Sequence, residues 1–588
     1  MKKLFALLCI VVVFAYVAVF AACDNWNNPG DKLGGGGEGD VAEAVDASEY
    51  DEAKDEIKAH TDLSKLAGDT SENNARTVEP TTGIVQISES ATYIFKGTYG
   101  GIYIAKEKLT LHFIFDGATI TNNDGVAIDG TVNKKTVLTI TLKDGTTNTV
   151  TNTGVDTDDE GVNAIHIKGS LYFNGKGTLN VTSNSKSAIK ASKDIQIVDA
   201  VLNLKAANHG ITGASVVAAN CTINVTDAGK DGINAECDEA KAFGLEDGYV
   251  ALANVNYTCN VADDGIQANT VAYIDGGNYS IKAMGKGIRV SEIVYTEKDS
   301  SGNKVEKTVT DGQYLIAIAN GTVTINTYND AIHTNSGNVL IEGGTITVSC
   351  SDDAIHADNL VKITNGTINI TSCYEGIEGA YVEISGGTID LTSRDDGINA
   401  ASYDSNIKPH IIISGGEVTV NATGDGIDSN GSILISGGTV TVHGPTTGRD
   451  AGLDADNGIV VNGGKLFASS ALGMVETPAR NSTQYVVSYA HQSKISAGSV
   501  VSLRDSAGNV LIEVTVLKTC QSVIMSCPEL TKGSTYYVYG GDKQMTSFKI
   551  TSIITTIGSS GNSFPGGPGG PGGGPGGRPE ITKKSPTT

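Results

Sequence analysis

Tryptophan is almost absent from this sequence, and several other residue types are scarce. Trp26 is the one tryptophan in 588 residues, and aromatic residues make up 6% of the chain. A sugar-binding face built mainly from tryptophan rings is therefore excluded. Proline is also scarce, with 12 residues, whereas glycine is abundant, with 73. Glycine, Asn and Asp separate short runs of Thr, Ile and Val, which is typical of many short strands and turns.

The nine cysteines contain no CxxC pair. Cys520 and Cys527 are near enough in the sequence to form a bridge, and buried free thiols are an equally good interpretation of the scattered remainder.

Positive charge is in short supply. Lys and Arg number 42 against 66 Asp and Glu, so the formal net charge is −24. Such a chain should repel nucleic acid and anionic membranes, and we expect it to meet an anionic polymer only where a cation bridges the two. An acidic surface also serves simply to keep a secreted protein soluble.

The N-terminus predicts export. Lys2 and Lys3 precede an apolar run from Leu4 to Ala22, which is typical of a signal peptide. The run ends in Phe20-Ala21-Ala22-Cys23, which resembles a bacterial lipobox with Cys23 as the lipidated residue, although Phe20 departs from the usual Leu. An uncleaved membrane anchor is the alternative. We expect a protein of the cell envelope, held by its lipid and exposed at the cell surface.

A repeat occupies most of the chain. Asp395-Asp396-Gly397-Ile398 matches Asp263-Asp264-Gly265-Ile266, and an apolar anchor residue recurs in steps of about 22 residues. The anchors are Ile165, Ile189, Ile211, Ile233, Ile266, Ile288, Ile332, Ile355, Ile377, Ile398, Ile427 and Leu453. Longer steps hold insertions, one of them at 296–310.

Each unit contains three short alternating runs, and one of them follows a Gly pair, as in Ile341-Glu342-Gly343-Gly344-Thr345. One such unit cannot bury its inward Ile and Val alone, but stacked units form a continuous core. The sequence therefore predicts an all-β fold: a right-handed parallel β-helix with three sheets, followed by a small antiparallel β-domain.

The expected domains follow from these patterns. We predict a lipoprotein signal peptide at 1–22, a flexible acidic tether that can contain one helix at 23–80, and the β-helix at 81–475. A small C-terminal β-domain follows at 482–556, and a disordered Gly/Pro-rich tail at 557–588.

Acidic residues recur at the corner before the anchors. We call the position two residues before each anchor the acid ladder. From Asp330 to Asp450, six consecutive rungs carry an acid near this corner. Stacked carboxylates repel one another unless a cation, a hydrogen bond or a raised pKa relieves them. Calcium prefers such oxygen-rich sites, so we predict one or more Ca²⁺ ions here. The predicted ligands are Asp263, Asp264, Asp330, Asp352, Asp353, Glu375, Asp395, Asp396, Asp425 and Asp450.

Asp-Gly is also an ordinary turn former, so a purely structural role for these acids stays open.

A second row of polar residues lies one residue after each anchor, and we call it the polar ladder. Alternation along a strand makes these side chains face outward. The ladder is extended and suits a hydroxyl-rich polymer, and a solvated surface without ligand is the alternative. The residues predicted to contact a ligand are Asn234, Gln267, His333, His356, Glu378, Asn399 and Asp428.

The combination of motifs resembles a known family. Repeated Asp-Gly-Ile-x-Ala with Ile-x-Gly-Gly-Thr-Ile-x-Val, behind a lipobox and ahead of a short β-domain, is similar to the bacterial carbohydrate-binding β-helix lipoproteins of the clostridial cellulose- and pectin-binding type. The resemblance covers roughly residues 81–556. It implies a pectate-lyase-like β-helix, calcium at the Asp-rich corners, and binding of plant cell-wall polysaccharides.

We therefore expect a monomeric, calcium-dependent polysaccharide-binding protein that does not catalyse a reaction. One alternative is a calcium-dependent pectate-type lyase, for which Arg394 or Arg449 would be the base. Another is a surface adhesin or scaffold with a protein partner.

Overall fold

A computed structural model describes residues 39–46, 48–62, 66, 68, 70–132, 135–154, 162–237, 246–298, 304–309 and 314–558. The predicted signal peptide, the lipidation site Cys23 and nearly all of the predicted tail lie outside these residues. Within them, no helix is both long and apolar enough to cross a membrane.

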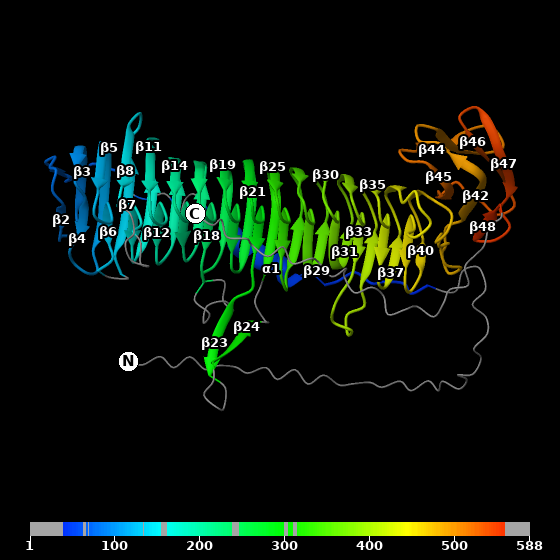
Figure 1. Ribbon diagram of the computed structural model, residues 1–588, viewed down its shortest axis with the longest axis horizontal. Helices are drawn as coiled ribbons and strands as arrows, with labels where there is room; N and C mark the ends of the chain where they lie inside the picture. The colour runs from blue at the N-terminus through cyan, green and yellow to red at the C-terminus, as the bar shows by residue number, and fades with distance from the viewer. Residues whose placement is uncertain are drawn as a thin grey trace, which may run out of the picture.

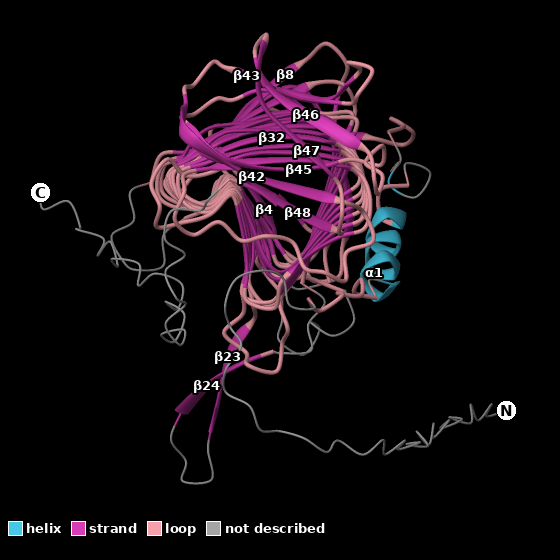
Figure 2. Ribbon diagram, turned by 90° about the vertical axis from the view of Figure 1, so that its right-hand side faces the viewer, coloured by secondary structure: helices cyan, strands magenta, loops and turns pink. Residues whose placement is uncertain are grey.

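The fold is the expected parallel β-helix. Short strands from successive rungs stack in parallel along a long rod, as Figure 1 shows. Seen from the end, the strands form the sides of one continuous coil (Figure 2). We name its three sheets as follows. The anchor sheet carries the anchor residues, and the entry sheet precedes it in each rung. The strap sheet follows the anchor sheet and is the one against which the N-terminal segment 39–66 packs.

The strands of the anchor sheet are mostly three residues long. They are β2 (Val85–Ile87), β4 (Ile102–Ile104), β6 (Ile128–Gly130), β9 (Ile165–Ile167), β12 (Ile189–Ala191), β15 (Ile211–Gly213), β18 (Ile233–Ala235), β20 (Ile266–Ala268), β22 (Ile288–Val290), β26 (Ile332–Thr334), the first parts of β29 (Ile355–Ile363) and β31 (Ile377–Ile384), β33 (Ile398–Ala400), β36 (Ile427–Ser429) and β39 (Leu453–Ala455).

The strap sheet contains the second parts of β29 and β31 and the first parts of several long strands. Its other strands are β1 (Arg76–Val78), β7 (Val137–Leu142), β10 (Ser170–Asn174), β13 (Ile195–Val198), β16 (Val216–Ala219), β27 (Asn338–Ile341), β34 (His410–Ile413), β37 (Ser432–Ile435) and β40 (Ile459–Val461). The long strands, which continue into the entry sheet, are β3 (Thr92–Tyr99), β5 (Thr110–Asn122), β19 (Val250–Val261), β21 (Val271–Ala283) and β25 (Leu315–Thr327).

The entry sheet consists of the second parts of these long strands and ten further ones. They are β8 (Thr147–Asn152), β11 (Thr178–Ser183), β14 (Val201–Ala206), β17 (Thr222–Ala228), β28 (Thr345–Ser349), β30 (Thr367–Ser372), β32 (Thr388–Ser393), β35 (Glu417–Ala422), β38 (Thr439–His443) and β41 (Lys465–Ser470).

Stacking in register builds the core. Ile189 lies beside Ile165 on one side and Ile211 on the other, and all three side chains are fully buried. Each rung thus covers the apolar side chains of the rung before it. Because the spacing of the anchors fixes this register, the sequence alone predicted which residues stack.

The glycine before the anchor is needed for space and not for its backbone conformation. The structure gives no positive φ at Gly232 or Gly397, but a Cβ at these positions would meet the hydroxyl of Tyr257 or the side chain of Val420. In the Gly pairs the second glycine does have positive φ, as at Gly344 (φ 83°). At this position of the Gly pair the positive φ favours glycine, because L side chains rarely adopt that backbone conformation.

Two additions interrupt the rod. The insertion at 296–310 belongs to a hairpin, β23 (Val294–Lys298) with β24 (Lys304–Thr308), which projects from its side (Figure 1). The C-terminal β-domain caps the last rung, because β45 (Cys520–Ser526) pairs antiparallel with β41.

The C-terminal domain has two sheets. β42 (Val486–Ile495) pairs with β45 and β48 (Ile554–Ile557), and a separate four-stranded sheet has the order β44 (Val510–Thr515), β43 (Val500–Arg504), β46 (Thr535–Gly540) and β47 (Lys543–Lys549). Cys520 and Cys527 are both buried free thiols in this domain.

The described part of the predicted tether packs along the rod. We call residues 39–66 the strap. Its helix α1 (Ser48–Ala59) buries Ala53 and Ile57 against outward apolar side chains of the strap sheet, among them Tyr273 and Leu315 (Figure 2). Without the strap this apolar surface would face water, at a cost of about 25 cal/mol per Å².

The strap runs antiparallel to the order of the rungs. The Val45 N–H donates to Glu383 Oε1 at 2.6 Å, and Lys54 Nζ lies 2.6 Å from Glu342 Oε1. A later strap residue, Leu66, belongs to the same apolar cluster as Val198, far closer to the N-terminal rungs. The strap therefore links rungs that are distant from one another along the rod.

His443 lies at the contact between the last rungs and the C-terminal domain. The side chain is 3% exposed, and its Nδ1 accepts a hydrogen bond from the Leu517 N–H at 3.4 Å. Burial and the nearby Lys518 lower the pKa of His443 to about 4. Since an unfolded histidine titrates near pH 6.5, the unfolded chain binds more protons between the two values, and stability falls as pH drops through that window.

We predict that His443→Gln reduces the loss of unfolding free energy between about pH 7 and about pH 4.5 by on the order of 1–2 kcal/mol. Urea titrations of both proteins at both pH values measure this. An equal loss in the variant and the parent chain would contradict the role of His443.

Candidate functional site

The two predicted ladders lie side by side and contact each other. Strand pairing places the polar ladder in one continuous register. It runs through Asn234, Gln267, Arg289, His333, His356, Glu378, Asn399, Asp428 and Asp454. Each acid-ladder residue lies three positions before the polar-ladder residue of its rung, just around the corner. Several of the carboxylates contact polar-ladder side chains: Asp264 contacts Arg289, Asp330 contacts His333 and Asp353 contacts His356.

The polar ladder is more enclosed than a flat outer face would be. Its side chains lie outside the apolar core, but several of them are only 5–9% exposed: Asn234, Gln267, His333, Glu378 and Asn399. Contacts with the acid ladder contribute to this enclosure at His333, which lies beside Asp330, and at Asn399, which donates to Glu375.

One oxygen of most acid-ladder residues supports the backbone of the next rung. Asp264 Oδ1 accepts the Lys286 N–H at 2.7 Å, and Asp396 Oδ1 accepts the Asp425 N–H at 2.7 Å. Asp330 Oδ1 accepts the Asp353 N–H at 3.1 Å in the same way. Such bonds to a charged acceptor stabilise the corner, so each of these acids has a structural role whatever its second oxygen binds.

In the middle rungs the second oxygen meets a cationic side chain of the protein. Asp330 is fully buried; its Oδ2 binds Lys286 Nζ and lies 2.7 Å from His333 Nδ1. Burial opposes the ionisation of Asp330, but His333 and Lys286 outweigh it and hold its pKa below the usual range. This corner is already neutralised and does not fit a calcium ion.

The neighbouring corner is similar. Asp264 Oδ2 lies 3.2 Å from the guanidinium of Arg289, and Asp231 Oδ2 lies 3.0 Å from His209 Nδ1. Asp263 completes this group of acids. The guanidinium of Arg289 thus lies beside Asp264, where the sequence predicted calcium.

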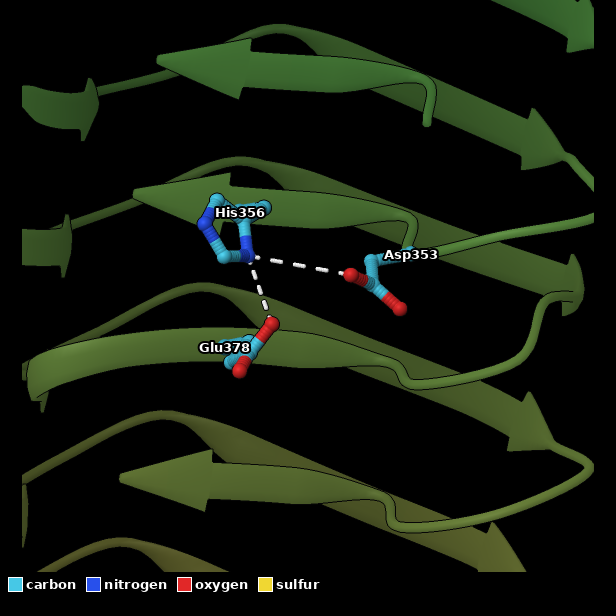
Figure 3. A group of neighbouring side chains, drawn as sticks. All are labelled: Asp353, His356 and Glu378. Carbon is cyan, nitrogen blue, oxygen red and sulfur yellow. Dashed lines mark hydrogen bonds and ion pairs between the residues drawn. The ribbon is translucent and has the colours of Figure 1, made fainter. Parts of the chain in front are cut away.

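His356 neutralises a third group, shown in Figure 3. Its Nδ1 lies 2.5 Å from Glu378 Oε2 and 3.7 Å from Asp353 Oδ2, and its Nε2 lies 3.0 Å from Asp358 Oδ1. Burial opposes the charge on His356, but Asp358 and Glu378 raise its pKa to about 10. An imidazolium therefore occupies the centre of this group. The ring also stacks on His333, with centroids 4.7 Å apart.

The C-terminal rungs contain acids without such partners. Ligand oxygens of Asp396, Asp425 and Asp428 lie within 4.8 Å of one another. Among the described residues, no Lys, Arg or His forms an ion pair with any of the three. Burial and neighbouring carboxylates raise the pKa values of Asp396 and Asp425 to about 7 and that of Asp428 to about 8. We call Asp396, Asp425 and Asp428 the acid cluster.

The surroundings of the acid cluster supply further oxygens. Asn399, 8% exposed, precedes Asp428 in the polar ladder, and its Oδ1 is buried without a hydrogen-bond partner among the described residues. Asp454 follows Asp428 in register, and burial together with Asp454 raises the pKa of Glu476 to about 7. A set of oxygen donors alone, with excess negative charge, is what Ca²⁺ selects, so these residues fit the ion.

The remaining predicted calcium ligands are distributed along the corner. Asp352 groups with Asp330 and Asp353, and Glu375 Oε2 accepts a hydrogen bond from Asn399 Nδ2 at 3.1 Å. Asp450 is half-buried, and burial and Asp395 raise its pKa. Asp395 is itself hydrogen-bonded by the Tyr374 hydroxyl and raises the pKa of that hydroxyl to about 12.

Asn234 and Gln267, two further predicted ligand residues, are also engaged within the chain. Asn234 Nδ2 donates to Glu236 Oε1 at 3.0 Å, and Gln267 Nε2 donates to Ser291 Oγ at 2.5 Å. Gln267 Oε1 is buried without a partner among the described residues.

The two arginines considered as a lyase base differ in their contacts. Arg394 donates from Nε to the Cys373 carbonyl at 3.1 Å and from Nη2 to the Ser351 carbonyl at 2.5 Å, so it holds successive corners together. Arg449 is exposed next to Asp450. The contacts of Arg394 are those of a structural residue, because they fix its guanidinium on the backbone.

Two basic residues within the ladders indicate the internal cations from the sequence. Lys286 occupies an acid-ladder position and Arg289 a polar-ladder position, directly between acidic rungs. A cation in a ladder of carboxylates predicts an ion pair with the neighbouring rung. Glu476 and Asp358 lie outside both ladders, and no periodicity could have placed them at the site.

Comparison with known proteins gives two results. Residues 81–354 and 351–485 match the family described as carbohydrate-binding domain-containing protein. A solved structure of the polysaccharide lyase-like protein from C. thermocellum, a gadolinium derivative, is 26% identical over 36% of this chain and 86% of that chain, with a TM-score of 0.33. No curated protein matches the chain. The family match extends along the β-helix and includes both ladders.

Proposed function

The chain belongs to the carbohydrate-binding domain-containing family, and from that we propose that it is a calcium-dependent polysaccharide-binding protein of the cell envelope that does not catalyse a reaction. Plant cell-wall glycans such as pectin or cellulose are the proposed ligands. The observation that carries the proposal is the continuous polar ladder from Asn234 to Asp454, because it follows the rod over many rungs. An extended row of hydrogen-bonding groups suits an extended polymer better than a small molecule.

Calcium dependence is proposed for the acid cluster only. Asp396, Asp425 and Asp428 would hold the ion, and Asn399, the neighbour of Asp428 in register, would assist through its Oδ1. A bound Ca²⁺ supplies the positive charge through which sugar carboxylates or hydroxyls coordinate. The corners around Asp264 and Asp330 are excluded from this proposal because the cationic side chains of Arg289 and Lys286 already pair with these two acids.

We also propose that a lipid on Cys23 anchors the chain at the cell surface. The support is the sequence alone: Lys2 and Lys3, the apolar run and the small residues before Cys23. Mass spectrometry of the protein from its own membrane tests this, and an unmodified Cys23 would contradict it.

A depletion assay tests the function. The full-length chain is mixed with insoluble polygalacturonate, with cellulose and with a cross-linked dextran, each in Ca²⁺ and in EDTA. We expect depletion by a cell-wall glycan in Ca²⁺, reduced in EDTA, and none by dextran. No depletion by any of the glycans would exclude the proposed function and favour a protein partner. Unsaturated uronate products, detected by their ultraviolet absorbance in the supernatant, would favour the lyase alternative.

A further inference from the structure

A pocket lies at the corner that follows the anchor sheet, next to the His356 group of Figure 3. It has a volume of about 310 Å³ and opens to solvent. This is at the lower end of the usual range for ligand pockets, about 300–1,000 Å³, so the pocket suits a single sugar ring better than a long segment of polymer. The lining residues that matter here are Ser336, His356, Asp358, Asn359, Glu378, Tyr403 and Asp404.

A long connection between two strands builds one wall of this pocket. Residues 430–431 connect β36 to β37, whereas residues 401–409 make the same connection from β33 to β34. Asp404 Oδ1 accepts hydrogen bonds from the Asn406 N–H at 2.9 Å and from Asn406 Nδ2 at 2.7 Å. Ser402 Oγ accepts the Asp404 N–H at 3.2 Å. These bonds give the wall a defined shape.

Tyr403 on this wall presents an aromatic ring to solvent. Its side chain is 86% exposed, and no other large hydrophobic side chain among the described residues is more exposed. A single exposed tyrosine needs no explanation by itself, but this one lines a pocket together with hydrogen-bonding groups. The combination indicates a ligand with an apolar face and polar edges. A pyranose ring has both, because its C–H groups form an apolar face and its hydroxyls surround it.

The opposite wall supplies hydrogen-bonding groups in fixed positions. Asp358 Oδ1 lies 3.0 Å from His356 Nε2, and Asp358 Oδ2 accepts the Ser336 N–H at 3.0 Å. Burial opposes the ionisation of Asp358, but the contacts with His356 and Ser336 outweigh it and lower its pKa. Each carboxylate oxygen has a second lone pair, so Asp358 can also accept hydrogen bonds from sugar hydroxyls. Asn359 Nδ2 donates to Asn338 Oδ1 at 2.7 Å, which fixes its amide.

The charge of the pocket distinguishes neutral from acidic sugars. Among the described lining residues, His356 is the one cationic side chain, and Glu378 and Asp358 already share it. Asp404 adds an exposed carboxylate. A sugar carboxylate would meet like charges here, whereas sugar hydroxyls meet charged acceptors that form strong hydrogen bonds. The pocket therefore favours a neutral sugar over a uronate.

We propose that this pocket binds a neutral sugar unit of the polysaccharide, with the Tyr403 ring stacked on the apolar face of the sugar. Asp358 and Asp404 accept hydrogen bonds from its hydroxyls, and no metal ion is needed. The inference rests on the proposed polysaccharide-binding function and deepens it by naming a neutral sugar as the ligand of one subsite. Asp396 precedes β33 and Tyr403 follows it, so this pocket and the proposed calcium site lie on either side of one short strand.

Calorimetry in EDTA with three neutral trisaccharides (cellotriose, xylotriose and galactotriose) tests the proposal on the full-length chain. The parent chain should bind at least one of them, more tightly than trigalacturonate. We expect Tyr403→Ala to weaken this binding by roughly tenfold or more, because the stacking surface is lost. Tyr403→Phe keeps the ring and should retain most of the affinity. Tyr328→Ala is the matched control, since Tyr328 is 57% exposed and lies outside the pocket, and it should leave the affinity unchanged.

Three results would overturn the proposal: no binding of any neutral trisaccharide in EDTA, binding of trigalacturonate or of the cationic triglucosamine at least as tightly, or unchanged affinity in Tyr403→Ala. If a glycan is still retained in the depletion assay in any of these cases, the pocket assignment fails and the proposed function stands. If no glycan is retained in the depletion assay, the proposed function fails. Circular dichroism of each variant confirms that the β-helix is folded.

Discussion

Replacing Asp330 by Ala is expected to destabilise the chain by roughly 3–5 kcal/mol. Asp330 is fully buried, binds Lys286 and lies 2.7 Å from His333. Its removal leaves a buried ammonium without its counter-charge, and the Asp353 N–H loses its acceptor. Both interactions are lost at one corner in the middle of the rod. The rungs on either side stack on this corner, so they are destabilised as well. Urea unfolding followed by circular dichroism measures the effect.

Two further variants separate charge from shape at Asp330. Asp330→Asn keeps an oxygen for the Asp353 N–H but removes the negative charge. Asp330→Asn combined with Lys286→Met removes both charges, and we expect it to be more stable than Asp330→Ala because no ammonium remains buried without a partner. A loss below about 1 kcal/mol for Asp330→Ala would show that the pair contributes little, as surface pairs do.

Calcium is expected to raise the unfolding temperature of the parent chain, and Asp425→Asn with Asp428→Asn is expected to abolish that increase. A ligand that binds only the folded state stabilises it by about 2.7 kcal/mol at a concentration of one hundred times its Kd. The described residues contain four groups of three side chains that could hold a metal ion. Among these groups, the acid cluster is the one in which no side chain forms an ion pair with a Lys, Arg or His. Removing two of its charges should therefore remove the calcium response almost completely.

The matched control for this pair is Asp263→Asn. Asp263 belongs to an acidic corner of the same kind, but Arg289 pairs with its neighbour Asp264. We expect Asp263→Asn to keep the full calcium response. Thermal unfolding in EDTA and in a series of Ca²⁺ concentrations gives the comparison. A parent chain that does not respond to Ca²⁺, or an undiminished response in the double variant, would contradict the assignment to the acid cluster.

The stability of the double variant in EDTA provides a further test. Burial and mutual repulsion raise the pKa values of Asp425 and Asp428, so the ionised carboxylates destabilise the folded chain when no cation is present. Asp425→Asn with Asp428→Asn should therefore be at least as stable as the parent chain in EDTA at pH 8. This outcome also shows that the loss of calcium response does not come from misfolding.

The sequence by itself determined the β-helix and its register. The spacing of the anchors from Ile165 to Leu453 places one apolar residue per rung, and a parallel stack leaves a single way to align them. That register correctly placed the polar ladder, including the neighbours His333 and His356. The periodicity is sufficient to predict the register because every rung has an inward Ile or Leu that only the next rung can bury.

Only the tertiary structure decided which charges meet. Net charge is a sum over the chain, so −24 could not reveal that Lys286 neutralises Asp330. Such contacts depend on side chains reaching around a corner between rungs, and they do not repeat.

The position of the strap over the strap sheet was likewise decided only by the tertiary structure. Ile57 meets Tyr273 and Leu315 only because the chain returns along the rod, a path that no repeat encodes. Stacking within the rungs is a local and periodic interaction, which the sequence shows directly. The ion pairs and the packing of the strap join residues that are distant in the sequence and do not repeat. They therefore cannot be predicted from the periodicity and are seen only in the folded structure.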